Sequence, residues 1–199
     1  MKHNKSITKT GLIAALMLLL YACSEITPDE AEQNLQDENI PVTEEALIAN
    51  VQTNDAEVVR GLLTAGVTPD AQDEQDVPAL IWASDLGYAG IAEQLIAHGA
   101  RIDTRENGVS PLMIAAMEGH SDVVEILLEA DANVDLQNQE GMTALMSAAF
   151  SGHKEIVKLL IENQADPLLK MSNGVRAHQL ANYEGHEEIA SYIREVVQR

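Results

Sequence analysis

The chain repeats itself with a period of about 33 residues, and this period constrains its fold more than any other feature. Equivalent leucines recur in steps of 33, 32 and 33 residues. They are Leu47, Leu80, Leu112 and Leu145. A fifth unit follows, because Gly174 lies 33 residues after Gly141. A unit this short cannot cover an apolar face by itself, so the repeat predicts a stack in which each unit packs on its neighbours.

The clearest unit opens with a pattern typical of a short helix. Ser110 can accept from the unpaired N–H groups of the first turn, and Pro111 suits the first helical position. Leu112, Ala115 and Ala116 recur at i, i+3 and i+4, so they share one face of that helix. The small alanines would let a paired helix approach closely.

A glycine then ends the first helix and a second helix follows. The glycines at this point are Gly87, Gly119, Gly152 and Gly185. The predicted buried stripe of the second helix consists of Val123, Val124, Leu127 and Leu128. Burial of each of these side chains contributes roughly 1.5–3 kcal/mol. The sequence therefore predicts an all-α solenoid of about five helix-turn-helix units.

Two units carry a resemblance to a known repeat. They are "NGVSPLMIAAMEGHSDVVEILLEADANVDLQ" (107–137) and "QEGMTALMSAAFSGHKEIVKLLIENQADPLL" (139–169). Both resemble the ankyrin repeat, whose pattern runs G-x-T-P-L-H-x-A-A-x-x-G-H-x-x-V-V-x-x-L-L-x-x-G-A-D. The resemblance covers residues 43–199 and implies a curved array of paired helices. Its approximate repeats are 43–74, 75–106, 107–138, 139–171 and 172–199.

Several turns and caps depart from that pattern. Gly66 and Gly99 supply a left-handed turn after the second helix, where later units have Asp131 and Gln164. Glutamine tolerates a left-handed backbone poorly, so the turn at Gln164 is the one in question. Pro78 replaces the usual threonine and removes one cap.

The two end units are also altered. Arg176, His178 and Asn182 stand where the pattern has threonine, leucine and alanine. A terminal repeat keeps one face in water, so these polar residues predict a cap. In the first unit, Asn50 and Asn54 replace the alanine and glycine of the pattern.

The N-terminal residues have the features of a secretory signal. The stretch "MKHNKSITK" has three lysines and no acid, and residues 11–22 are apolar throughout. A basic lead before about a dozen apolar residues is typical of a signal peptide, whereas a membrane-spanning helix needs about 20 apolar residues. The sequence therefore predicts a signal peptide over residues 1–22.

Leu20-Tyr21-Ala22-Cys23 resembles the bacterial lipobox, in which the leader is cut before a cysteine that carries lipid. The resemblance implies that Cys23 becomes the first residue and anchors the chain through acyl chains. In enterobacterial lipoproteins an aspartate after the cysteine favours the inner membrane, and Ser24 stands there instead. The resemblance therefore implies the outer membrane, with the protein facing the periplasm. The alternative is an ordinary signal-peptidase site with an incidental cysteine. Cys23 is the only cysteine, so no disulfide and no thiolate metal site is expected.

The charge of the chain is strongly negative. Its 32 acidic residues against 12 Lys and Arg give a formal net charge of −20, and loss of residues 1–22 with their three lysines brings this to −23. Such a surface repels phosphate backbones, so no nucleic-acid partner is expected. It would steer a basic protein toward the chain, although solubility alone explains it equally well.

Residues 24–42, "SEITPDEAEQNLQDENIPV", are acidic, bounded by prolines and free of aromatic residues. They predict a solvated tether that could extend about 60 Å from the membrane. The alternative is that "DEAEQNLQ" forms two helical turns. The predicted organisation is thus a lipidated N-terminus and linker over 23–42, ahead of a repeat domain over 43–199.

No catalytic constellation is found in the repeats. His120, His153 and His186 each follow the glycine of their unit, where the ankyrin resemblance implies a structural histidine. No two histidines stand at i, i+4, and no serine lies in a G-x-S-x-G turn. We therefore expect no enzyme and no cofactor.

One stretch, "DANVDLQNQEGM", begins like a calcium loop, with Asp131, Asn133 and Asp135 at positions one, three and five. Leu136 then replaces the turn glycine, and Met142 replaces the bidentate glutamate. The same residues form the ordinary turn between ankyrin repeats. No metal site is predicted.

The ankyrin resemblance implies that a partner binds the concave side, through hairpin tips and first helices. At the positions that vary most in the family, successive units carry Met117, Phe150 and Tyr183, with Val109, Met142 and Val175 beside them. The second unit has Asp85 instead, and the acids around these positions are Asp85, Glu106, Glu118 and Glu140. An exposed apolar stripe of this kind favours a protein interface. The alternative is that some of these side chains pack against the neighbouring repeat.

Together these features predict a monomeric, non-catalytic protein-binding module of a Gram-negative cell envelope, in contact with the membrane only through lipid on Cys23. Two roles stay open. The chain is a scaffold or helper of an envelope protein, or an immunity protein that neutralises a toxin delivered to the periplasm. An enzyme or small-ligand binder is the remaining alternative and would need a deep pocket with perturbed titratable groups.

Overall fold

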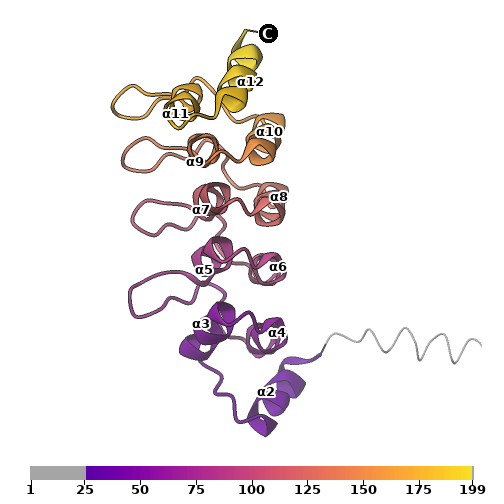
Figure 1. The fold of residues 1–199 in the computed structure, drawn as a ribbon. Helices are drawn as coiled ribbons and strands as arrows, with labels where there is room; N and C mark the ends of the chain where they lie inside the picture. The colour runs from indigo at the N-terminus through magenta and orange to yellow at the C-terminus, as the bar shows by residue number, and fades with distance from the viewer. Residues whose placement is uncertain (1–25, 199) are drawn as a thin grey trace, which may run out of the picture.

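A computed structural model describes residues 26–198, and these residues form eleven helices and no strand. Figure 1 shows the helices as a stack of antiparallel pairs, with a long hairpin loop before the first helix of the later pairs. The first helices of the pairs are α3 (Glu44–Gln52), α5 (Ala79–Asp85), α7 (Pro111–Glu118), α9 (Ala144–Ser151) and α11 (Ala177–Tyr183). The second helices are α4 (Ala56–Thr64), α6 (Ala89–Ala97), α8 (Ser121–Glu129), α10 (Lys154–Glu162) and α12 (Glu187–Val197). The predicted all-α solenoid of five helical pairs is confirmed.

The caps form as the sequence predicts. The hydroxyl of Ser110 accepts from the backbone N–H of Met113 at 3.3 Å, and Thr143 does the same for Met146. Pro78 precedes α5 and provides no side-chain cap. Within residues 26–198, none of the helices has the length and apolar composition needed to cross a bilayer.

The left-handed turns form even where glycine is replaced. Gly66 and Gly99 have φ of 96° and 92°, and the equivalent Asp131 and Gln164 have φ of 62° and 68°. The turn at Gln164 keeps its backbone bonds, since the N–H of Ala165 donates to the carbonyl of Leu160 at 2.9 Å. The packing of the units on either side therefore overrides the local preference of glutamine.

The single step of 32 residues has its origin in a hairpin tip. In the third unit Glu106 and Val109 exchange both backbone hydrogen bonds across Asn107 and Gly108, which have φ of 51° and 86°. This is the geometry of a two-residue Asn-Gly turn. The second unit closes its tip with one more residue, between Asp73 and Val77. The missing residue lies in a loop, so the helices keep their register.

The core runs through the whole stack between the two rows of helices. The four repeated leucines are at most 2% exposed. In α8, Val123, Val124 and Leu127 are fully buried, whereas Leu128 lies at the edge of the stripe and is only half-buried. Three of the four residues predicted for the buried stripe of this helix are therefore fully buried, and Leu128 is not.

A further helix, α2 (Pro28–Asp37), precedes the first pair and packs against α4 (Figure 1). Thr27 and Glu30 form a reciprocal capping box at its start. Ala31 and Leu35 are buried, although the rest of the helix is polar and exposed. The segment therefore takes the place that a preceding second helix would occupy.

The predicted solvated tether over residues 24–42 is thus wrong for its central part, and the alternative of helical turns in "DEAEQNLQ" is confirmed. Leu35 lies over Gly61 of α4, with its Cδ2 3.4 Å from the point where a Cβ on Gly61 would be. The leucine thus packs directly on the backbone of α4. The chain before the array has no 60 Å reach while α2 is docked.

Candidate functional site

The predicted stripe residues Met117, Phe150 and Tyr183 lie at the C-terminal ends of α7, α9 and α11, which are neighbours in the row of first helices (Figure 1). They are 41%, 43% and 72% exposed. Leu86, at the end of α5, is also an exposed apolar residue and was missed by the sequence reasoning. The sequence could have indicated Leu86, because it directly precedes Gly87 and therefore lies at the end of a first helix, as Met117 and Phe150 do. We call these four side chains the exposed row.

The side chains predicted beside the row are less exposed. Val109 and Met142 are half-buried and pack against the core, which is the alternative that the sequence left open for them. Val175 is half-buried as well. Among the predicted acids, Asp85, Glu118 and Glu140 are exposed, and Glu106 is half-buried and accepts from the side chain of Asn107 at 2.9 Å.

The repeated histidines connect each unit to the one before it. Nε2 of His120 lies 2.9 Å from the carbonyl oxygen of Asp85, and Nε2 of His153 lies 2.9 Å from that of Met117. The third, His186, lies 3.1 Å from the carbonyl of Phe150. A carbonyl only accepts, so the ring proton is on Nε2 in each case. These bonds fix the backbone of Met117 and Phe150, which are members of the exposed row.

The glycines that end the first helices make room for these rings. A Cβ on Gly119 would lie 2.6 Å from Cε1 of His153, and one on Gly152 would lie 2.5 Å from Cε1 of His186. Both glycines also have a left-handed backbone, with φ of 87° and 84°. A side chain at either position would therefore be strained and would also displace the histidine of the next unit.

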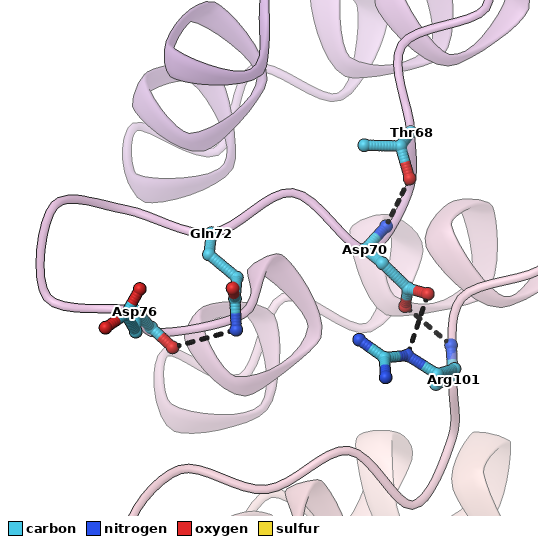
Figure 2. Close-up of polar contacts among 5 residues, drawn as sticks. All are labelled: Thr68, Asp70, Gln72, Asp76 and Arg101. Atoms are coloured by element: carbon cyan, nitrogen blue, oxygen red, sulfur yellow. Dashed lines mark hydrogen bonds and ion pairs between the residues drawn. The ribbon is translucent and has the colours of Figure 1, made fainter.

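A second series of contacts joins the turns between units. Both oxygens of Asp70 bind Arg101, one accepting from its backbone N–H and the other from Nε, each at 2.9 Å (Figure 2). In the same view, Thr68 accepts from the backbone N–H of Asp70, and Gln72 donates to the carbonyl of Asp76. The carboxylate thus holds the turn of its own unit against the turn of the next.

The stretch that begins like a calcium loop belongs to this series. Asp103 accepts from the backbone N–H of Asn133 at 3.1 Å, and Asp135 accepts from that of Asp166 at 2.8 Å. Asn133 in turn accepts from the N–H of Asp135. These oxygens serve the turns between units, and residues 26–198 contain no group of three or more His, Cys, Asp or Glu placed to hold a metal ion.

The hairpin tip of the second unit is ordered by Asp73. Its carboxylate accepts from the N–H of Gln75 at 2.8 Å, from that of Val77 at 2.9 Å and from Nε1 of Trp82 at 2.9 Å. Partial burial alone would raise the pKa of Asp73, but the donors on Val77, Gln75 and Trp82 outweigh burial and lower it below its usual value. The carboxylate of Asp73 therefore holds the hairpin tip to Trp82 of α5, a first helix.

Comparison with known proteins agrees with this geometry. The family model for ankyrin repeats matches residues 46–138 and 112–196. The chain belongs to the ankyrin repeat family. Ankyrin repeats are generally non-catalytic domains that bind other proteins, so the array is a protein-interaction module.

Three relatives show how far the similarity extends. A putative ankyrin repeat-containing protein of Treponema pallidum is 34% identical over 105 residues, which are 52% of this chain and 35% of that protein. The ankyrin repeat and SAM domain-containing protein 6 of Danio rerio is 39% identical over 74 residues, 36% of this chain and 10% of the relative. The E3 ubiquitin-protein ligase MIB2 of Gallus gallus is 38% identical over 60 residues, 30% of this chain and 6% of the relative. The chain thus spans about a third or less of the length of these relatives.

The histidine contact can be tested with a matched pair of glycine variants. Gly185→Ala adds a Cβ in the same left-handed turn of the last unit, where nothing lies within 4 Å, and should cost about 1–2 kcal/mol. Gly119→Ala should cost about 1–3 kcal/mol more, because the added Cβ also displaces the ring of His153. Urea unfolding measures both. The excess should shrink in Gly119→Ala/His153→Ala, and equal losses at the two glycines would contradict the role of the ring.

Proposed function

We propose that this chain is a non-catalytic protein-binding module of the bacterial cell envelope, anchored by lipid on Cys23, whose partner lies along the exposed row. The observation that supports it is the row itself. Four large apolar side chains are solvent-exposed at corresponding ends of successive helices. Large contiguous apolar patches on a monomer mark interaction sites, and this row is where such a patch would form.

The row is suited to binding because its backbone is already held in place. The histidines of the following units bind the carbonyls of Met117 and Phe150. A surface that does not have to be ordered on binding loses less conformational entropy, so more of the apolar contact contributes to affinity. Methionine and aromatic residues are also enriched at the cores of protein interfaces.

Charge around the row favours a basic partner. Asp85 and Glu118 are exposed at the end of α5 and α7, next to Leu86 and Met117. With a formal net charge of −20, the chain attracts basic proteins over distances of about a Debye length, ~8–10 Å. The apolar side chains would supply affinity, and the acids would speed encounter and exclude acidic proteins.

The anchor rests on the sequence, because Cys23 lies outside the described residues. The lipobox-like residues 20–23 follow a basic lead and an apolar run. With α2 docked, residues 24–27 separate Cys23 from Pro28, and four extended residues span at most about 14 Å. The array would therefore stay close to the bilayer, on the periplasmic side of the outer membrane, and meet partners there.

Two roles fit a basic partner held near the membrane. The first is a scaffold or helper of an envelope protein, which the fixed surface and the short anchor both favour. The second is an immunity protein, which the net charge of −20 favours, since a toxin with a basic surface would be attracted and covered. The identity of the captured partner separates them.

Capture from the native envelope tests the exposed row. A variant carrying Met117→Lys and Phe150→Asp should lose the cross-linked partner that the unchanged chain retains, because both charges would be buried at the interface. The control carries the same charge changes at Leu168→Lys and Val197→Asp, which are exposed apolar residues outside the row. The control should keep the partner. Retention by both variants, with the fold intact by circular dichroism, would refute the row as the binding surface.

The anchor is tested separately by fractionation and labelling. Cells expressing the chain are grown with labelled palmitate. The unchanged chain should carry the label and sediment with the outer membrane, whereas Cys23→Ser should lose the label. An unlabelled chain that is nevertheless processed after residue 22 would contradict lipidation and leave the ordinary signal-peptidase site.

A further inference from the structure

The outer end of the last unit contains a small open cavity with several polar side chains in its lining. Helices α11 and α12 border a volume of about 240 Å³, and the lining residues are His178, Gln179, Asn182, Tyr183 and Arg194. His178 occupies the position of the repeated leucines, and Arg194 that of Leu128 and Ile161 in the preceding units. In the fourth unit the equivalents of His178, Gln179 and Asn182 are Leu145, Met146 and Ala149, which are buried. In the last unit His178 and Gln179 are half-buried and Asn182 is exposed.

The charges that act on this cavity are positive, although the chain is strongly acidic. Burial of His178, with the guanidinium groups of Arg176 and Arg194 nearby, lowers the pKa of its ring below the usual value. Nδ1 of the ring is buried and has no hydrogen-bond partner among the described residues. A neutral ring with its proton on Nε2 fits this environment, because an imidazolium would need a partner for its buried Nδ1–H.

The lining has the donors that a carboxylate requires. A guanidinium matches a carboxylate in geometry and in charge, and Arg194 uses one nitrogen, Nη2, for the hydroxyl of Ser191 at 3.1 Å. Within residues 26–198, Arg194 forms no ion pair with a carboxylate. The imidazole, the amides of Gln179 and Asn182 and the hydroxyl of Tyr183 add neutral donors. The volume lies below the ~300–1,000 Å³ of most drug-sized ligand sites and suits a single small group.

We propose that this cavity is a carboxylate-binding site, in which Arg194 supplies the charge and His178, Asn182 and Tyr183 donate around it. Tyr183 is also the last member of the exposed row. A carboxylate at one end of the partner segment could therefore enter the cavity while the apolar part lies along the row. The entry of a partner's carboxylate rests on the proposed function, whereas carboxylate binding by the cavity does not.

A titration with acetate tests the cavity alone. The ring signals of the isotope-labelled full chain are followed by NMR as sodium acetate replaces sodium chloride at constant ionic strength. The signals of His178 should shift in a saturable way, and the titration midpoint of its ring should rise, because a bound anion offsets the two guanidinium groups. His98, exposed at the end of α6, should not respond.

Two arginine variants provide the matched comparison. Arg194→Gln should weaken acetate binding about tenfold or more, since a charge-assisted pair is lost. Arg105→Gln, which removes the same charge from an exposed hairpin residue, should leave binding unchanged. Arg194 is exposed, and thermal unfolding checks that the variant keeps the fold. A shift that is linear in acetate, equal at His98, or unchanged in Arg194→Gln would overturn the site.

The link to a partner has its own readout. If the partner's carboxylate enters the cavity, Arg194→Gln should reduce the amount of partner captured by the exposed row, and Arg105→Gln should not. Unchanged capture with intact acetate binding would overturn the link and leave the cavity as an independent site. Loss of the exposed row as an interface would leave the acetate result unaffected, so the two proposals can fail separately.

Discussion

The contact between each repeated histidine and the unit before it is the interaction on which the array depends. The ring of His153 fits into the space left by Gly119 and donates to the carbonyl of Met117, and the pattern recurs at His120 and His186. Aspartates at the turns add a parallel series of bonds from each unit to the next. Since no unit covers its own apolar face, these contacts join units whose leucines bury one another, except between the first two units, where Tyr88 takes the place of the histidine.

The same contacts connect the fold to the surface that we propose for binding. The carbonyl groups that the histidines hold belong to residues of the exposed row or next to it. The side chains of Met117 and Phe150 therefore point to solvent from a backbone that is bonded on its other side. A change in the packing of one unit would move the row of the unit before it, so stability and the proposed recognition would share the same residues.

Much of the fold follows from the sequence because the repeat presents the same local pattern several times. The caps at Ser110 and Thr143 and the buried leucines each follow from residue type and spacing. The helix α2 was expected only as an alternative to the tether, because Ala31 and Leu35 are its only buried residues. Its docking is a tertiary contact of Leu35 with Gly61 of α4, which spacing alone does not give.

The candidate site was predictable in part. The variable positions of the repeat identified Met117, Phe150 and Tyr183, but no pattern showed that Val109 and Met142 pack against the core. Leu86 was overlooked because Asp85 holds the equivalent position in its unit. The cavity at His178 depends on how α12 places Arg194 beside α11, which is a tertiary relation that spacing alone does not give.

Hydrogen exchange along the full chain tests most directly whether contacts between units hold the array together. If they do, each helical pair is stabilised by the neighbours on both sides, and protection should be highest in α7 to α10 and fall toward both ends. The helix α2, with two buried side chains, should exchange faster than α4. Equal protection in all five pairs, or slower exchange in the end pairs than in the middle, would contradict this account.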